Sequence, residues 1–144
     1  MSIAALLTWL ATALGGFYML GLWLSGGGAR REGSSALPVP VVFGHFLLAA
    51  AGLVVWVIYL FAGGGTLAWT AFVLLLPVAL LGFVMFARWL AVARTPAVRT
   101  TGGAPGAAAA DAPAERSFPR PVVFGHGLLA VATLLLVLLT ALSE

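Results

Sequence analysis

The two histidines of this chain stand in the same hexapeptide, Pro-Val-Val-Phe-Gly-His, which occurs at residues 40–45 and again at residues 121–126. His45 and His126 are therefore equivalent positions of a repeated motif. Neutral imidazole is a common ligand of haem iron and of copper, and an ionisable residue inside a long apolar segment is more often functional than not. The two histidines are the first candidates for a functional site.

The repeat includes the segments that precede the histidine motifs. Residues 13–24 (ALGGFYMLGLWL) align without gaps on residues 79–90 (ALLGFVMFARWL). The matched residues include Gly16 with Gly82, Met19 with Met85, and Trp23 with Trp89. The alignment predicts two tandem copies of one helical hairpin in the same orientation, residues 1–62 and residues 67–144.

The composition places this chain in a membrane. Of its 144 residues, 62% are hydrophobic and 8% are charged, which is more apolar surface than one soluble core of this size can bury. The absence of cysteine excludes disulfides, thiolate metal sites and cysteine nucleophiles. Seven basic residues, all arginine and widely spaced, are too few for a nucleic-acid surface.

Four apolar segments are long enough to cross a bilayer core, which needs about 20 residues. They cover residues 3–24, 39–62, 67–93 and 121–142. Prolines open the second and fourth segments, where a missing N–H costs nothing, and Pro77 predicts a kink in the third. We expect an all-α integral membrane protein, a single transmembrane domain of residues 1–144 folded as an up-down bundle of four helices.

The connections between the segments predict the orientation. Residues 95–119 are rich in Pro, Gly, Ala and Thr without an apolar period, which predicts a flexible loop. All arginines lie in or beside this loop and the loop that joins the first two segments. By the positive-inside rule both loops are cytoplasmic and both termini are outside. The Ala, Gly and Arg bias without lysine is typical of a GC-rich bacterial gene, so we expect a bacterial plasma membrane.

Aromatic residues lie near the ends of the predicted spans. Trp23 and Trp89 fall near the inner boundary, and Trp56, Tyr59 and Trp69 fall near the outer one. This placement predicts aromatic belts at the two membrane interfaces.

The repeat brings both histidines to one depth. Each lies about six residues inside its helix, or about 9 Å from the inner boundary. In an up-down bundle the second and fourth helices lie diagonally, so the two imidazoles can face each other across the axis. The first and third helices bring Gly16, Met19, Gly82 and Met85 to a similar depth. The four segments contain no acidic residue, which argues against a carboxylate-based proton or cation path.

The first interpretation of this centre is one b-type haem with His45 and His126 as its two axial ligands. Glycines would let the backbone approach the porphyrin, and arginines near the inner boundary would pair with its propionates. The glycines are Gly16, Gly82, Gly44 and Gly125, and the arginines are Arg88 and Arg120, with Arg94 close by.

In this arrangement the chain resembles the membrane b-type cytochromes, such as the cytochrome b561 class, in which histidines of a four-helix core hold haem between helices. The resemblance rests on the bundle and on the Gly-His pairs Gly44–His45 and Gly125–His126. It implies electron transfer or a place in a membrane redox complex. The chain departs from that class in having one histidine pair, where the class has four histidines and two haems.

Two other interpretations remain open. His45, His126, Met19 and Met85 could form a tetrahedral N2S2 site suited to Cu(I). Alternatively, the histidines are neutral packing residues, hydrogen-bonded to each other, to a backbone carbonyl or to Thr133, in a cofactor-free anchor or assembly subunit of a membrane complex. No serine-protease-like constellation, phosphate-binding loop or zinc spacing occurs. The lipid bilayer is the partner that the composition implies, and a homo-oligomer is left open.

Overall fold

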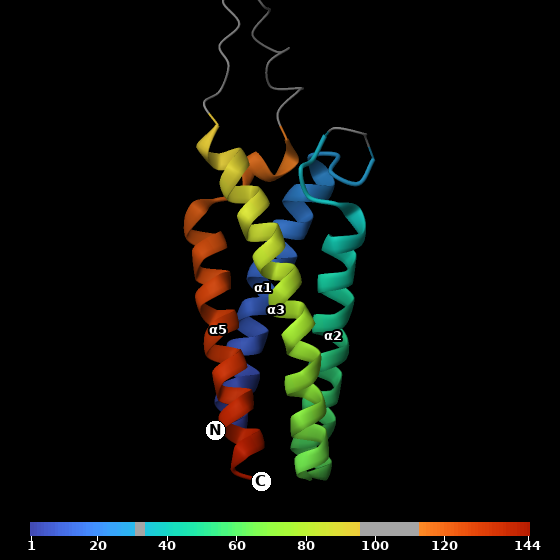
Figure 1. The fold of residues 1–144 in the computed structure, drawn as a ribbon, viewed down its shortest axis with the longest axis vertical. Helices are drawn as coiled ribbons and strands as arrows, with labels where there is room; N and C mark the ends of the chain where they lie inside the picture. The colour runs from blue at the N-terminus through green and yellow to red at the C-terminus, as the bar shows by residue number, and fades with distance from the viewer. Residues whose placement is uncertain (31–33, 96–112) are drawn as a thin grey trace, which may run out of the picture.

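The computed structural model describes residues 1–30, 34–95 and 113–144. Four long helices run side by side along its length (Figure 1). They are α1 (Ser2–Ser25), α2 (Val39–Ala62), α3 (Gly65–Arg94) and α5 (Arg120–Leu142), and a short 3-10 helix, η1 (Ala114–Ser117), precedes α5. Each long helix is long and apolar enough to cross a membrane, and the described ranges contain no strand. The prediction of an all-α, multi-pass membrane protein is confirmed.

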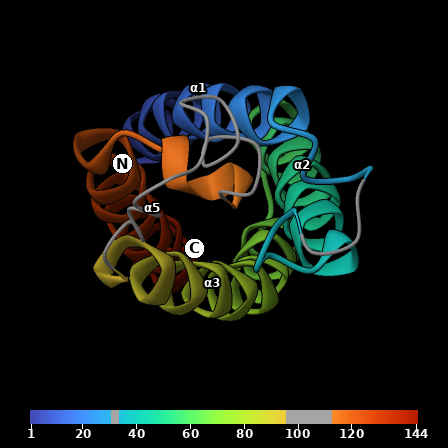
Figure 2. The ribbon, with the colours of Figure 1, turned by 90° about the horizontal axis from the view of Figure 1, so that it is seen from above.

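The helices alternate in direction and follow the order α1, α2, α3, α5 around the bundle (Figure 2), so α2 and α5 lie diagonally. The C-terminal ends of α1 and α3 and the N-terminal ends of α2 and α5 lie at one end of the bundle, which we call the loop end (Figure 1). Both termini and the turn from α2 to α3 lie at the other, the terminal end (Figure 1). The closest packing joins α2 to α3 and α1 to α5, whereas α1 and α2 touch each other little.

Proline and glycine set several helix boundaries. α2 and α5 each have proline in the first turn, where the backbone N–H has no helical partner to lose. Gly63 and Gly64 make the turn between α2 and α3 with φ of 70° and 97°, a region that side chains strongly disfavour. Pro77 lies inside α3, which continues through it as one helix.

The buried side chains form two separate clusters, one near each end of the bundle. The terminal-end cluster contains Ala5, Trp9, Trp56, Tyr59, Ala68, Ala71, Leu75, Val78, Val137 and Ala141. The loop-end cluster contains Trp23, Leu37, Val42 and Ala114. Small residues make room for the large rings: a Cβ added to Gly52 would lie 3.2 Å from the ring of Trp9. The indole rings therefore fill the interior at the two ends.

The prediction of aromatic belts is wrong for most of the residues on which it rested. Trp23, Trp56, Trp89 and Tyr59 are only 1%, 0%, 4% and 7% exposed, and Trp69 alone keeps a large exposed fraction, 41%. The indole N–H groups find partners within the protein: Trp23 donates to Ser35 Oγ at 2.8 Å and Trp56 to the Ser2 carbonyl at 3.3 Å. A buried tryptophan needs both close packing and a hydrogen-bond acceptor for its N–H. Trp23 and Trp56 find both inside the protein, near the two ends of the bundle.

Part of the segment predicted as a flexible loop, residues 95–119, is packed against the bundle. Residues 96–112 lie outside the described ranges, but η1 lies across the loop end of the bundle (Figure 2). Glu115 has no exposed surface, and its carboxylate accepts hydrogen bonds from Ala36 N–H at 2.6 Å and Ser35 Oγ–H at 2.8 Å. The flexible-loop prediction therefore fails for residues 113–119, because these bonds and the burial of Ala114 hold η1 in place.

Candidate functional site

The rings of His45 and His126 meet across the bundle. They come from the diagonal helices α2 and α5, their centroids are 6.3 Å apart, and their planes are inclined by 52°. This confirms the expectation that the repeated motif brings the two imidazoles together. The pairing depends on the order of the helices, since only diagonal helices can present side chains to each other across the axis.

Each histidine is anchored to a helix of the other half of the chain. The Nδ1 atom of His45 lies 2.9 Å from the Val78 carbonyl oxygen on α3, and that of His126 lies 2.9 Å from the Thr12 carbonyl oxygen on α1. A carbonyl oxygen can only accept, so in each neutral imidazole Nδ1 carries the proton and donates. Nε2 then carries the lone pair, which is the form in which histidine binds metals.

Two glycines make room for the rings. A Cβ added to Gly16 would lie 3.2 Å from Cε1 of His126, and one added to Gly82 would lie 3.3 Å from Cε1 of His45. Both distances are shorter than ordinary contacts of a methyl group, so a side chain at either position would push against the imidazole. Thr12 and Val78 each stand directly before the two aligned segments, which contain Gly16 and Gly82. The two histidine environments are therefore equivalent in their contacts.

The residues around the histidines are less buried than those nearer the two ends of the bundle. No residue of α1 between Trp9 and Trp23, of α2 between Val42 and Gly52, or of α5 before Thr133 is buried. The same holds in α3 between Val78 and Trp89. These four stretches lie between the two buried clusters and include both histidines, so we call them the histidine level.

Both Nε2 atoms keep some accessible surface. Within the ranges that the structure describes, no buried side-chain nitrogen or oxygen lacks a hydrogen-bond partner. The hydrogen bonds of both histidines are made by Nδ1, so neither Nε2 is enclosed without a partner. Two accessible lone pairs on facing rings are suited to bind one ion or group between them.

No protein-family model, curated protein or solved structure matches this chain. The function is therefore argued from the geometry of the site. Among the described residues, no group of three or more His, Cys, Asp or Glu side chains could hold a metal ion.

The other predicted site residues lie at varied distances from the rings. Gly44 faces Leu81, whose Cδ1 would lie 3.7 Å from an added Cβ, and a Cβ on Gly125 would meet no atom within 4 Å. Met85 packs against the loop-end cluster, and Met19 is partly buried. The glycines that contact the imidazoles are thus Gly16 and Gly82 rather than the two in the Gly-His pairs.

The predicted arginines separate into two places. Arg88 is exposed and donates from Nη1 to the Ala36 carbonyl at 3.0 Å. Arg120 lines a pocket between α3 and α5 together with Arg94 and Phe124. The structure thus groups Arg120 with Arg94 and not with Arg88.

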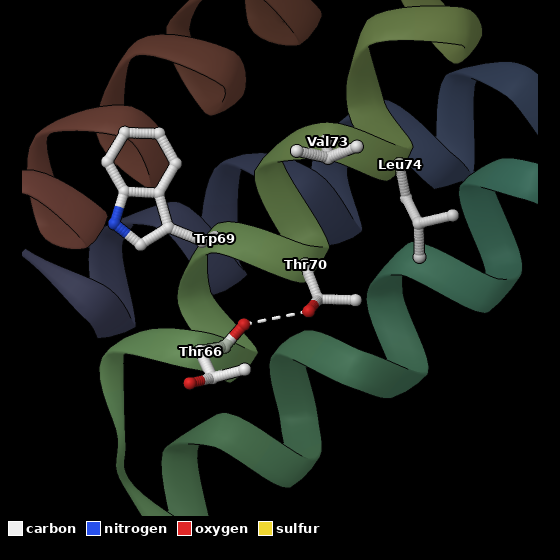
Figure 3. A pocket seen from close by; sticks show the side chains of 5 residues that line it. All are labelled: Thr66, Trp69, Thr70, Val73 and Leu74. Atoms are coloured by element: carbon white, nitrogen blue, oxygen red, sulfur yellow. Dashed lines mark hydrogen bonds between the residues drawn. The ribbon is translucent and has the colours of Figure 1, made fainter.

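A second hollow lies on α3 toward the terminal end (Figure 3). All five side chains that line it belong to α3, namely Thr66, Trp69, Thr70, Val73 and Leu74. Its polar groups are satisfied locally, since the Thr70 hydroxyl donates to the Thr66 carbonyl at 2.7 Å. With no titratable side chain it offers no chemistry, and the exposed Trp69 is suited to contact lipid.

Sequence reasoning offered a backbone carbonyl as one possible partner of the histidines but did not name the two acceptors, and it did not find the buried carboxylate of Glu115. The carbonyls of Thr12 and Val78 could have been proposed, because each stands four residues before a glycine in the matched segments. Glu115 carries no comparable signal, since a single acid in a polar stretch looks like any solvated residue.

Proposed function

We propose that this protein is a small multi-pass protein of a bacterial plasma membrane that binds one b-type haem between α2 and α5. His45 and His126 are the axial ligands, and the protein serves electron transfer, as a carrier or as a subunit of a membrane redox complex. The observation that carries the proposal is the 6.3 Å separation of two imidazoles whose Nε2 atoms are unprotonated and accessible.

The separation agrees with simple geometry. An imidazole nitrogen lies about 2 Å from a first-row transition metal, and about 1 Å from its own ring centroid. Two rings that bind one ion from opposite sides therefore have centroids about 6 Å apart, close to the observed 6.3 Å. The inclination of 52° between the planes is compatible with this binding, because rotation of a ring about its metal–nitrogen axis changes neither distance.

The surroundings of the rings support the same proposal. The Nδ1–H bonds to Val78 and Thr12 fix the orientation of the imidazoles and increase the basicity of Nε2. Gly16 and Gly82 leave the rings room beside α1 and α3. The histidine level lies between the two buried clusters, and the buried tryptophans and η1 limit water entry at both ends. Haem bound there would supply one-electron redox chemistry.

The packing of the helices explains how a flat group could be held. One tight pair, α1 with α5, carries His126, and the other, α2 with α3, carries His45. Each imidazole is hydrogen-bonded to the other helix of its own pair. A flat group between the two pairs would therefore have one histidine on each of its faces. The sparse contact between α1 and α2 leaves this interface less closely packed than either pair.

The test is the spectrum of protein purified in detergent from haem-replete cells. The wild-type protein should carry one haem per chain and show a Soret shift in the reduced-minus-oxidised difference spectrum. His45→Ala and His126→Ala should each abolish this spectrum, because one remaining imidazole cannot provide both axial ligands. Gly21→Ala is the matched control, since the added methyl group would meet no atom within 4 Å. A colourless wild-type preparation would exclude the haem proposal.

A cofactor-free anchor or assembly subunit is the second candidate, favoured by one observation. The Nδ1–H bonds of His45 and His126 tie α2 to α3 and α5 to α1, so the histidines also serve as structural links. If the protein is such a cofactor-free subunit, the wild-type protein is colourless and His45→Ala lowers thermal stability only.

One copper per chain, lost in Met19→Ala, would instead support the N2S2 site formed by Met19, Met85 and the two histidines.

A further inference from the structure

The pocket between α3 and α5 lies at the loop end of the bundle. Its volume is about 230 Å³, and it is lined by Trp89, Leu90, Ala93, Arg94, Arg120 and Phe124. Phe124 is 55% exposed, and its ring packs edge-to-face against Phe86 and Trp89 at centroid distances of 5.8 and 5.9 Å. The pocket therefore combines an aromatic wall with two guanidinium groups. Its volume is below that of most drug-sized ligand sites and suits a small headgroup.

The two arginines of this pocket have no partner among the residues that the structure describes. Arg94 ends α3 and Arg120 begins α5, and neither side chain forms an ion pair or hydrogen bond within residues 1–30, 34–95 and 113–144. Arg88 and Arg116, by contrast, each donate to a backbone carbonyl.

The acidic residues of the described ranges do not compensate this charge. The carboxylate of Glu115 is buried and bonded to Ser35 and Ala36, and that of Glu144 accepts from Tyr59 at the terminal end. Within the described ranges, the positive charge of the pocket is thus not paired with a carboxylate.

The depth of the pocket matches the headgroup region of a bilayer. α5 has 23 residues and is about 34 Å long, slightly more than the hydrocarbon thickness of about 30 Å. Arg120, at its first residue, therefore lies at the edge of the hydrocarbon. Toward the terminal end, α5 exposes Leu128, Val131 and Leu135, with exposed fractions of 74%, 48% and 52%. An anionic head at the pocket would place its acyl chains along this apolar surface.

We propose that this pocket binds the phosphate group of an anionic phospholipid through Arg94 and Arg120. Guanidinium groups bind phosphate oxygens through paired, charge-assisted hydrogen bonds, and the wall of Phe124 and Trp89 covers the glycerol and upper acyl carbons. The proposed ligand is a membrane lipid, and it is independent of the proposed haem site.

The test compares lipid retention by native mass spectrometry, with the full-length protein in mixed micelles of phosphatidylglycerol and phosphatidylcholine of the same acyl chains. Wild-type protein should retain phosphatidylglycerol preferentially. The double variant Arg94→Gln/Arg120→Gln should lose the preference by about fivefold for each arginine. The matched control Arg30→Gln/Arg88→Gln removes the same charge at the same end and should keep the preference. Circular dichroism should show equal helix content in all three proteins.

Three outcomes would overturn the proposal. The first is equal retention of the two lipids by the wild-type protein. The second is an equal loss of preference in both double variants, which would show general attraction by surface charge. The third is displacement of the preference by millimolar inorganic phosphate, which would assign the pocket to a free anion. The haem content of Arg94→Gln/Arg120→Gln is measured in parallel, and its loss with intact lipid preference would assign the arginines to propionates instead.

Discussion

His126 lies against Gly16 so closely that a Cβ at residue 16 would be 3.2 Å from Cε1 of the imidazole. The His126 ring cannot easily move away, because its Nδ1–H is bonded to the carbonyl of Thr12, which lies one turn before Gly16 on α1. The glycine and the carbonyl together determine where Nε2 is placed. The same relationship joins His45 to Gly82 and Val78.

This relationship predicts the effect of adding one methyl group. Alanine normally stabilises a helix relative to glycine by about 1 kcal/mol. Gly16→Ala and Gly82→Ala should instead lower the thermal stability and perturb the haem spectrum, because the methyl group displaces the ring and weakens its Nδ1–H bond. The control is Gly21→Ala, whose Cβ meets no atom within 4 Å and which should be neutral or stabilising. Equal behaviour of all three variants would show that the contact does not position the imidazoles.

Glu115→Gln should be destabilising by about 1–3 kcal/mol, although it preserves shape. Ser35 Oγ already accepts from Trp23 Nε1 and Leu37 N–H, so it has only its own proton to offer Glu115. The other carboxylate oxygen accepts from Ala36 N–H. Ser35 Oγ–H and Ala36 N–H therefore both donate to the carboxylate. The amide N–H group of glutamine, in place of either carboxylate oxygen, would face another donor.

The measurement for Glu115→Gln is thermal unfolding in detergent, together with hydrogen exchange of residues 113–117. The control is Ser117→Ala, which removes a local bond to the Ala114 carbonyl in the same short helix. Unchanged protection of η1 in Glu115→Gln would mean that the carboxylate is not what holds η1 in place.

Gly52→Ala should destabilise the terminal-end cluster by about 1–3 kcal/mol. The added methyl group would lie 3.2 Å from two carbons of the Trp9 ring and 3.6 Å from Leu74, so the large indole would have to shift within a packed core. Gly44→Ala is the matched control in the same helix, since its nearest contact is an ordinary 3.7 Å. Thermal unfolding of the two variants provides the comparison, and equal melting temperatures would contradict the packing at Gly52.

The predicted orientation can be tested by single-cysteine labelling, because the chain contains no cysteine. If the arginine-bearing loops are cytoplasmic, an impermeant maleimide added to intact cells should label Ser143→Cys at the terminal end. It should label Ser117→Cys at the loop end only after the membrane is opened. The reverse pattern would place both termini in the cytoplasm.

The meeting of the histidines was predictable because it follows from helix direction and position in the chain. His45 and His126 stand at equal distances from proline-marked helix starts, and up-down order makes α2 and α5 diagonal. The roles of Gly44 and Gly125 were not predictable in the same way. Which glycine contacts a ring depends on helix rotation, and the structure gives this place to Gly16 and Gly82.

The amino-acid sequence by itself determined the number of helices, their approximate ends and the common depth of the two histidines, since apolar length, proline and glycine act locally. The tertiary structure alone decided that Trp23, Trp56 and Trp89 face inward and that Glu115 is buried. The physical reason is that these helices are apolar on every side, so hydrophobic periodicity does not distinguish an inner face from a lipid-facing one. Which side chains face inward was decided by shape and by hydrogen bonding. Large rings pack against glycines, and buried donors lie beside acceptors.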